Sequence, residues 1–582
     1  MLARLPLFLL LVAAFAPAQT PCEGTPAYSP CEIPFELSTA DAAVRLNPYV
    51  NFVLQVEFRS PRFKTYLMPA FWDGSRNKMI VRFTPTEAGQ WIYKVTSNVS
   101  AFDGQQGMFN AAASDSPGFV NVANVHHWAT DNKKAHLWMG YIADRFSFVS
   151  AAEFDQQLNA AAQNKFNHFR GSILGNAKDR ALVFLGADRP NPTYFDELDR
   201  RIGEIHKRGI TTDLMLGSDP DTITSLFPDW RARERFIRYA VARYAAFNIT
   251  WQGLEAFEDY SDGRALLKEL GLDLKKLDPY QHPRSSNAKV TSSPLLPDGW
   301  MDYVIEGSED DAVGSVEHQF YPVPFVGVTD ARHLWSATMD GEYPAFRGDA
   351  PNVAKYWFEF MDDTRHWELE PYFDVDGTRA VALEDVEYVN YIEHPGPPVE
   401  VKVEKHGYDI QWLNPATGES LEQKKYSGEH FTGQAPDATH PWVLYIAREG
   451  HKESMLKSYK FESRPVPVQE IETDLKKVPF EIAVPPGNML IAAVPTQFSV
   501  KLTRQTRATR DMMFLWTGEA VSDGRGFRVL GTGSSGTFVI PASVAGNFPA
   551  VLTIHVTALN ANGKGYSADR VYQLEDASQR AK

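Results

Sequence analysis

The sequence predicts a multidomain protein with an N-terminal β-sandwich, a central (β/α)8 TIM barrel and C-terminal β domains. Three observations predict this order. Residues 34–122 consist of short runs in which apolar and polar side chains alternate, separated by Gly, Pro and Asn turns. From residue 126 strand-like and helix-like segments alternate, as in a parallel α/β fold. From residue 384 onward the helical pattern stops and strand-like runs return.

The first 18 residues have the pattern of a secretory signal peptide. Arg4 precedes an apolar run at residues 5–15, and residues 16–18 form an A-x-A cleavage site. We therefore expect a secreted or periplasmic protein, cleaved near Ala18, whose mature chain begins at Gln19. No later segment is apolar over the roughly 20 residues that a membrane helix needs, so we expect no membrane partner.

Cys22 and Cys31 are the only cysteines of the chain and stand close together just after the cleavage site. In an exported protein such a pair is expected to form a disulfide. A metal-binding pair or free thiols are the alternatives, and no nearby histidine supports the first. Pro21 stands before Cys22, where a lipid-anchored protein requires a small residue, which argues against a lipid anchor.

The composition indicates a globular, acidic protein. A formal net charge of -15 without a basic cluster offers no electrostatic surface for nucleic acid, so we expect no nucleic-acid partner. A neutral partner, such as a polysaccharide or oligosaccharide, fits this charge better. The 13 Trp and 23 Tyr suit flat sugar faces, although core packing alone gives similar numbers in large enzymes.

Two predicted strands, at residues 79–83 and 91–95, indicate the fold of the first domain. Both have the alternating pattern of a half-buried strand, and residues 84–89 form the turn between them. Two antiparallel strands would then present side chains such as Phe83 and Trp91 to one core. We therefore expect an Ig-like β-sandwich over residues 19–122.

The segment FWDGSRNKMIVRFTPTEAGQWIYKVTS, at residues 71–97, resembles the N-terminal sandwich domain of bacterial secreted proteins related to apiosidase-like glycoside hydrolases. YDIQWLNPATG at residues 408–418 and PWVL at residues 441–444 resemble the small β domain, of collagen-binding type, that closes such proteins. The resemblance spans most of residues 52–447. It implies that a catalytic barrel follows the sandwich and that the substrate is a carbohydrate.

Eight strand-like segments with helices between them predict a (β/α)8 barrel at residues 123–383. A doubly wound open sheet is the structural alternative. The expected strands are residues 136–141, 166–173, 210–217, 249–254, 284–288, 303–307, 324–328 and 343–346, and the expected helices include residues 151–164, 194–207, 230–247, 265–277 and 332–339.

Two β domains are expected after the barrel, a small antiparallel domain at residues 384–462 and an Ig-like domain at residues 463–582. A Pro-rich linker separates them. The glycines at residues 531–536 spell G-x-G-x-x-G, but this run leads into a strand and not into a helix that could bind phosphate. We therefore interpret it as a turn.

The fourth barrel strand ends in two acidic candidates, and in such barrels the reacting groups lie at the C-terminal ends of the strands. Glycoside hydrolysis needs one carboxyl group that protonates the leaving oxygen and a second that attacks or stabilises the anomeric carbon. Glu255 is the candidate general acid/base, and Glu258 is the alternative because a short turn could bring either side chain over the mouth. Both could instead only favour the N-terminus of the following helix.

Asp330, after the seventh strand, is the candidate second carboxylate. The resemblance to apiosidase-like proteins implies a glutamate at this strand end, and Thr329 stands in its place. Glu342 is the fallback, although it begins the eighth strand and should face away from the mouth. The resemblance also implies an acidic residue after the glycine of the first strand, for which Asp144 is the nearest substitute.

Further polar and aromatic residues near the predicted strand ends are candidates for substrate binding. The arginines among them could bind sugar hydroxyls or form structural ion pairs inside the barrel. The candidate set is Trp251, Arg170, His168, Trp138, Arg284 and Tyr321.

No metal site and no cofactor are expected. The acidic residues between Glu306 and Asp311 lack the alternating spacing of a calcium loop, and a solvated helix start explains them better. His126 and His127 are adjacent, and the sequence contains no H-E-x-x-H motif, so zinc-protease chemistry is unsupported.

Together these features predict a secreted glycoside hydrolase that acts on a polysaccharide or its side chains through two carboxylates, with a retaining mechanism. The competing hypothesis is a barrel that has lost its nucleophile and serves as a polysaccharide-binding or surface-scaffold protein. A third hypothesis, adhesion to collagen or another protein, rests on the resemblance of the small β domain alone.

Overall fold

The computed structural model describes residues 21–38, 41–186, 188–218, 220–259, 263–308, 310–348, 352–450, 471–520, 528–542, 545 and 547–577. The predicted signal peptide and its cleavage site lie outside these residues. The chain divides into two compact units, Met1–Ser116 and Pro117–Lys582, which are described separately. Among the described residues, no helix combines the length and apolar character needed to cross a membrane.

The first unit is a sandwich of two antiparallel sheets. Two short helices, α1 (Ala42–Arg45) and α2 (Pro48–Asn51), precede most of its strands. One sheet has the order β1-β5-β4 and the other the order β3-β2-β6-β7. Their strands are β1 (Cys31–Phe35), β2 (Leu54–Arg59), β3 (Thr65–Pro69), β4 (Phe71–Asp73), β5 (Lys78–Phe83), β6 (Gly89–Ser97) and β7 (Gln106–Ala111).

The sandwich core consists largely of aromatic rings from both sheets. The Phe58 and Phe83 rings stack with their centroids 3.8 Å apart, and Trp91 meets Phe83 edge-on at 5.2 Å. β5 and β6 lie in opposite sheets of the sandwich, and the prediction that they share one core is confirmed. The predicted disulfide between Cys22 and Cys31 is also confirmed.

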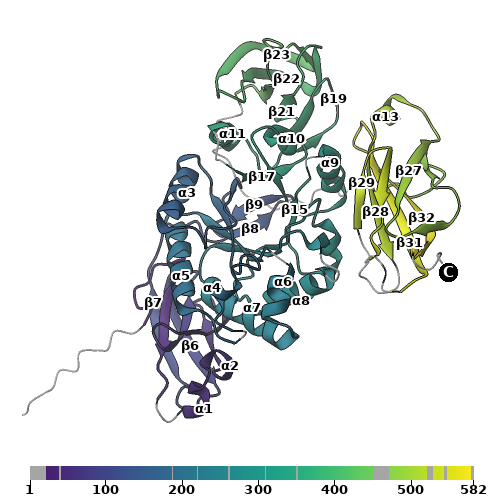
Figure 1. Ribbon diagram of the computed structural model, residues 1–582. Coiled ribbons are helices and arrows are strands. Elements are labelled where there is room, and N and C mark those ends of the chain that lie inside the picture. The colour runs from purple at the N-terminus through teal and green to yellow at the C-terminus, as the bar shows by residue number, and fades with distance from the viewer. Residues whose placement is uncertain are drawn as a thin grey trace, which may run out of the picture. The chain divides into compact units, whose positions relative to one another are not determined.

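The second unit contains the predicted barrel (Figure 1). Eight parallel strands follow the order β14-β13-β12-β11-β10-β17-β16-β15. Between the two terminal strands, the Asp302 N–H donates to the Arg284 carbonyl oxygen at 2.8 Å and the Ser285 hydroxyl to the Tyr303 carbonyl oxygen at 2.7 Å, which joins the ends of the sheet. The strands are β10 (Gly140–Ile142), β11 (His168–Ser172), β12 (Thr211–Gly217), β13 (Ile249–Leu254), β14 (Arg284–Ser285), β15 (Val304–Glu306), β16 (Phe325–Thr329) and β17 (Glu342–Arg347).

Helices cover the outside of the barrel, and local signals fix their ends (Figure 1). The Ser150 side chain accepts the Glu153 N–H at the start of α3, and Asp229 caps α7 in the same way. Gly209, with a φ of +71°, follows α5. The helices are α3 (Ala151–Gln163), α4 (Arg180–Val183), α5 (Pro192–Lys207), α6 (Pro220–Leu226), α7 (Trp230–Tyr244), α8 (Gly263–Leu277), α9 (Asp311–Phe320), α10 (Leu334–Met339) and α11 (Asn352–Asp362), with short 3-10 turns at η1 (Phe257–Asp259) and η2 (Ser293–Asp298).

A hairpin of β8 (Val120–Ala123) and β9 (His127–Thr130) closes the N-terminal face of the barrel. Its Trp128 is fully buried and packs against Trp138, with the ring centroids 4.6 Å apart, and against Tyr303 at 5.1 Å. Trp138 lies just before β10, so this aromatic cluster fills the floor of the barrel and leaves the C-terminal strand ends for the site.

Antiparallel sheets follow the barrel, as expected. The first has the order β18-β20-β21-β24-β22-β19, with β23 paired to β22, and it begins at Glu370, before the predicted boundary at residue 384. Its strands are β18 (Glu370–Tyr372), β19 (Val375–Asp376), β20 (Arg379–Leu383), β21 (Glu387–Ile392), β22 (Val399–Leu413), β23 (Ser420–Gly433) and β24 (Trp442–Arg448).

The last β region has two sheets, of the orders β25-β27-β30 and β26-β32-β31-β28-β29. Gly533, with a φ of +88°, lies at the turn between β29 and β30, so the interpretation of the glycine run as a turn is confirmed. The elements are β25 (Phe480–Val484), β26 (Met489–Ile491), β27 (Pro495–Leu502), α13 (Arg507–Arg510), β28 (Met513–Ala520), β29 (Arg528–Thr532), β30 (Ser535–Val539), β31 (Ala550–Leu559) and β32 (Gly565–Glu575).

Candidate active site

Glu255 directly follows β13 at the mouth of the barrel, where its backbone N–H donates to the Gly217 carbonyl oxygen at the end of β12. The next residue, Ala256, has a φ of +47°. This left-handed conformation is unfavourable for a residue with a Cβ atom, and such strained positions concentrate at functional sites. The turn therefore ends the strand abruptly and fixes the place from which the Glu255 side chain extends.

The environment of Glu255 favours its protonated form. Partial burial raises the pKa of this carboxyl group, and the negative charge of Asp144 raises it further. The positive charges of Arg170 and Arg347 oppose this shift without cancelling it. A carboxyl group that keeps its proton above the usual range is suited to general acid catalysis. Arg347 ends β17, so side chains from four parts of the barrel act on one another here.

Asp144 and Arg170 form an ion pair beside Glu255. The Arg170 Nε lies 2.8 Å from Asp144 Oδ1, and its Nη2 lies 3.1 Å from Oδ2. Burial opposes the charge of Arg170, but the attraction of Asp144 outweighs this and raises the pKa of the guanidinium. The charge of the Asp144 carboxylate is thus balanced by Arg170, and the carboxylate lies close enough to Glu255 to affect its pKa.

A chain of hydrogen bonds leads from this pair into the barrel. Arg170 Nη1 donates to Asn287 Oδ1 at 2.5 Å, and Asn287 Nδ2 donates to Gln252 Oε1 at 2.9 Å. Gln252 Nε2 then donates to the Tyr303 hydroxyl at 3.2 Å. All four side chains are buried, so the chain holds the Arg170 guanidinium in one orientation.

Asp330 follows β16, as expected, but its carboxylate is occupied locally. Its Oδ1 accepts the backbone N–H groups of Arg332 at 2.8 Å and His333 at 3.0 Å, and lies 3.0 Å from His333 Nδ1. Burial alone would raise the pKa of Asp330, but these donors outweigh it and hold the pKa below its usual value. The side chain is half exposed and caps the turn before α10.

Glu258 lies in η1 and also makes backbone contacts. Its carboxylate accepts the N–H groups of Lys289, at 3.1 and 3.2 Å, and Val290, at 3.3 Å. These two residues belong to the loop after β14. The contacts fasten that loop to the end of β13, so a structural function explains Glu258 without catalysis.

The fold of this chain is similar to that of known proteins. Among solved structures, one described as a "putative glycoside hydrolase" from Bacteroides vulgatus ATCC 8482 aligns with a TM-score of 0.62 at 18% identity, covering 73% of this chain and 100% of that chain. A glycoside hydrolase family 5 protein from the same organism aligns with a TM-score of 0.50 at 14% identity, covering 57% and 94% of the two chains. The chain shares the fold of these proteins.

In the sandwich, residues 25–98 match a family described as a domain of unknown function (DUF5060). No curated protein sequence matches the chain. The likeness to the solved structures is therefore a likeness of fold alone.

Two of the predicted substrate-binding residues lie deep in the barrel. His168 begins β11 and does not end it, and its Nδ1 contacts Asp213 Oδ1 at 2.8 Å while its Nε2 contacts His136 Nε2 at 2.8 Å. The Trp138 ring stacks on His168 at 3.4 Å. Both side chains are fully buried toward the floor, so the expectation that they line the mouth is wrong.

Trp251, Arg284 and Tyr321 are also remote from the mouth. Trp251 points into the helix layer, where its Nε1 donates to Asp278 Oδ2 at 3.0 Å. Arg284 begins β14 and donates to the Trp300 carbonyl oxygen at 3.0 Å on the N-terminal side. Tyr321 precedes β16 on that same side. Of the six predicted substrate-binding residues, only Arg170 lies at the mouth.

Glu306 and Glu342, which the sequence analysis considered as a helix start and a fallback carboxylate, form a buried cluster behind the sheet. A Cβ atom on Gly314 of α9 would lie 2.4 Å from Glu342 Oε1 and 2.9 Å from Glu306 Oε2, which places both carboxyls in the layer between strands and helices. Burial raises the pKa of each carboxyl group, and the charge of Glu342 raises the pKa of Glu306 further. The expectation of a solvated helix start is confirmed for Asp310, which caps α9, and is wrong for Glu306.

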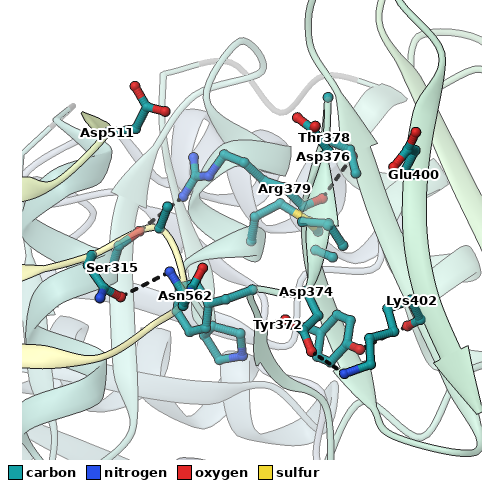
Figure 2. A pocket seen from close by; sticks show the side chains of 18 of the residues that line it. Ser315, Tyr372, Asp374, Asp376, Thr378, Arg379, Glu400, Lys402, Asp511 and Asn562 are labelled. Atoms are coloured by element: carbon teal, nitrogen blue, oxygen red, sulfur yellow. Dashed lines mark hydrogen bonds and ion pairs between the residues drawn. The ribbon is translucent and has the colours of Figure 1, made fainter. Parts of the chain in front are cut away.

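A separate cavity of about 510 Å³ lies beside the small β domain (Figure 2). Its charged lining groups are largely paired, with Lys402 Nζ 2.9 Å from Asp374 Oδ2 and Arg507 Nη2 2.9 Å from Asp376 Oδ2. The lining comes from α9, α10, β18–β20, β22, β23 and the last β region, and not from the C-terminal ends of the barrel strands. We therefore place the candidate active site at Glu255 and not in this cavity.

Proposed function

We propose that the protein is a secreted glycoside hydrolase in which Glu255 is the general acid/base and Asp144 the second carboxylate. The observation that carries this proposal is the pairing of a half-buried carboxyl group of raised pKa, Glu255, with a second carboxylate at the same barrel mouth. Glycoside hydrolysis requires one carboxyl group that donates a proton and a second that attacks or stabilises the anomeric carbon. The barrel fold shared with proteins described as glycoside hydrolases supports the same activity.

Arg170 explains how Asp144 can serve beside Glu255. Its guanidinium binds both carboxylate oxygens of Asp144, and the buried contact with Asn287 keeps it in place. The positive charge balances the negative charge that a nucleophile must carry before it attacks. We therefore assign to Asp144 the function that the sequence analysis gave to Asp330, whose carboxylate is engaged by the turn before α10.

The reaction follows from these positions. Glu255 donates its proton to the leaving glycosidic oxygen, and Asp144 attacks the anomeric carbon to form a glycosyl-enzyme ester. Glu255, now ionised, takes a proton from water as that water attacks the anomeric carbon, and the ester bond to Asp144 breaks. The product keeps the anomeric configuration of the substrate. The resemblance to apiosidase-like proteins supports a plant or microbial polysaccharide side chain as the substrate.

The experiment compares Glu255→Gln, Asp144→Asn and Asp330→Asn on aryl glycosides and cell-wall polysaccharides. We expect Glu255→Gln to lower kcat about 100-fold to 10,000-fold on polysaccharides, because proton donation contributes that much. Asp144→Asn should also abolish most turnover, and Asp330→Asn should retain it. Proton NMR of the first product anomer tests the retaining mechanism. Full activity of Glu255→Gln would overturn the proposal.

Two other outcomes have defined meanings. Loss of turnover in Asp330→Asn with activity kept in Asp144→Asn would return the nucleophile to Asp330 and leave Asp144 as the residue that positions Arg170. If the wild-type protein binds polysaccharide and cleaves none of the substrates, the barrel is a binding or scaffold protein. A binding assay on immobilised polysaccharide, run beside the kinetic assay, separates these cases.

A further inference from the structure

Three side chains with metal-binding atoms meet on the N-terminal side of the barrel. They are His126, just before β9, His318, near the end of α9, and Glu370, the first residue of β18. His318 precedes β16, and Gly341, which precedes β17, packs against the His318 ring. The cluster therefore lies at the starts of the barrel strands, opposite the mouth at which Glu255 lies.

The ligand atoms are close enough to bind one ion. His126 Nδ1 lies 3.0 Å from Glu370 Oε2, and His318 Nε2 lies 3.5 Å from the same oxygen. One such atom from each of the three residues lies within 4.8 Å of the other two. The His126 and His318 ring centroids are 4.0 Å apart.

His318 provides an independent sign that a ligand is missing from this cluster. Its side chain is almost fully buried, and neither of its ring nitrogens has a hydrogen-bond partner among the described residues. Leaving buried polar atoms unsatisfied costs free energy, and native structures rarely do so without a function. The Nε2 atom faces Glu370 at the distance given above, so an ion between them would satisfy it.

The hydrogen bonds of His126 lead to the same conclusion. Its Nε2 lies 3.1 Å from the Tyr321 carbonyl oxygen, which can only accept, so this nitrogen carries a hydrogen. In the neutral ring the lone pair of Nδ1 then points at the Glu370 carboxylate. These two electron-rich groups face each other at 3.0 Å, an arrangement that a cation bound by both would stabilise.

The surroundings match the outer contacts of metal sites. Metal-binding histidines usually donate their other N–H to a carbonyl or carboxylate, as His126 does toward Tyr321. His127 Nε2 lies 3.2 Å from Glu370 Oε1, and His127 Nδ1 lies 2.8 Å from the Tyr343 hydroxyl. These contacts fix the second oxygen of Glu370 and leave Oε2 directed at the other two histidines.

We propose that His126 Nδ1, His318 Nε2 and Glu370 Oε2 bind one Zn²⁺ ion. Two imidazoles and one carboxylate form a common zinc ligand set, whereas Ca²⁺ and Mg²⁺ prefer oxygen ligands alone. The Glu370 side chain is 28% exposed, which leaves one side open for a water as the fourth ligand. The ion joins the hairpin under the barrel, the last turn of α9 and the first strand of the small β domain.

The experiment uses the full mature chain after treatment with EDTA and dialysis. Calorimetric titration with ZnCl₂ should show one ion bound per chain, and Co²⁺ should give visible absorption bands of a low-symmetry nitrogen-oxygen site. His318→Gln and Glu370→Gln should each weaken Zn²⁺ binding by more than about 100-fold. His127→Gln should weaken it by about 10-fold to 100-fold, as loss of an outer contact does.

A matched control is His555→Gln, which removes a histidine paired with Asp569 in the last β region and should leave zinc binding unchanged. Circular dichroism of each variant tests whether it folds. If a variant of a ligand residue does not fold, the zinc affinity of His127→Gln, which removes only an outer contact, still tests the proposal. The proposal is overturned if the wild-type chain binds no Zn²⁺. It is also overturned if the His318→Gln variant binds Zn²⁺ as tightly as the His127→Gln variant. The cluster would then be a purely structural set of contacts between the histidines and Glu370.

Discussion

Asp144 and Arg170 face each other in a two-point ion pair at the barrel mouth, with nitrogen–oxygen distances of 2.8 and 3.1 Å. The pair lies beside Glu255, and both of its members act on the pKa of that carboxyl group in opposite directions. Burial and Asp144 raise the pKa of Glu255, while Arg170 lowers it. The pKa of Glu255 is therefore set first by burial and then by neighbouring charges, and single substitutions can change these charges.

Arg347→Gln tests this balance without touching the ion pair. Arg347 is exposed and its positive charge lowers the pKa of Glu255, so its removal should raise that pKa. If Glu255 is the general acid, the basic limb of the pH profile of kcat/KM should move to higher pH, because the acid keeps its proton longer. The shift should shrink with added salt, since exposed charges are screened.

Arg231→Gln, on the exposed surface of α7, is the matched control and should leave the profile unchanged. At the pH optimum, kcat of Arg347→Gln should change by less than about tenfold, because Glu255 still donates its proton. A basic limb that stays in place in Arg347→Gln would contradict the assignment of Glu255 as the group that controls it.

Asp330→Ala should lower stability more than it lowers activity. The carboxylate accepts two backbone N–H groups, of Arg332 and His333, in the turn before α10, and loss of such a cap costs about 0.5 to 2 kcal/mol. Asp330→Asn keeps an acceptor oxygen and should be close to the wild type. Chemical unfolding of the three proteins measures the difference. Equal stability of Asp330→Ala and the wild type would show that this turn needs no cap.

Trp91→Ala should destabilise the N-terminal sandwich by roughly 3 to 5 kcal/mol, the usual cost of deleting a buried large aromatic side chain. Trp91 is fully buried against Phe83, and Phe83 stacks on Phe58. The exposed Ile92 of the same strand supplies the control, because Ile92→Ala should cost much less. Calorimetry of the full chain should show the loss in the sandwich transition. A Trp91→Ala protein with an unchanged transition would contradict the packing described for this core.

The sequence predicted the order of the domains and all eight barrel strands because periodicity and turn residues are local properties. It could not predict which side of a barrel strand faces inward. Every residue of β13 is buried, because helices cover one face of the strand and the other face lies in the barrel interior. The sequence pattern therefore does not show whether Trp251 or Gln252 points toward the site. Gln252 faces inward and Trp251 faces the helices.

Strand ends limited the prediction of the site in a similar way. β14 has only two residues and begins at Arg284, so the residue that reaches Arg170 is Asn287, three positions further along. The candidate Arg284 belongs to the right segment, but it is not the residue that reaches Arg170. The Glu306–Glu342 contact joins residues of different strands, and a single sequence contains no sign of such a pairing.

Glu306→Gln should make the barrel more stable at high pH and leave it nearly unchanged at low pH. Burial and the neighbouring Glu342 raise the pKa of Glu306 well above its usual value. Below the unfolded-state pKa, near 4.3, both states are protonated and the full stability is present. As the pH rises, the unfolded chain releases this proton before the folded chain does, so stability falls until the folded-state pKa is passed. Glutamine resembles the protonated acid and does not titrate, so it removes this loss.

Glu197→Gln is a control with the opposite sign. Hydrogen bonding to Arg200 and Arg201 outweighs burial and lowers the pKa of Glu197 to about 2. Its contribution to stability is therefore present above the unfolded-state pKa and is lost as the pH falls toward 2. Urea unfolding between pH 4 and pH 8, followed by tryptophan fluorescence, measures both variants against the wild type. The free energy of unfolding of Glu306→Gln should exceed that of the wild type by an amount that grows with pH. The free energy of unfolding of the wild type should exceed that of Glu197→Gln by an amount that shrinks toward pH 4. A difference between Glu306→Gln and the wild type that does not vary with pH would show that Glu306 holds no proton in the folded barrel.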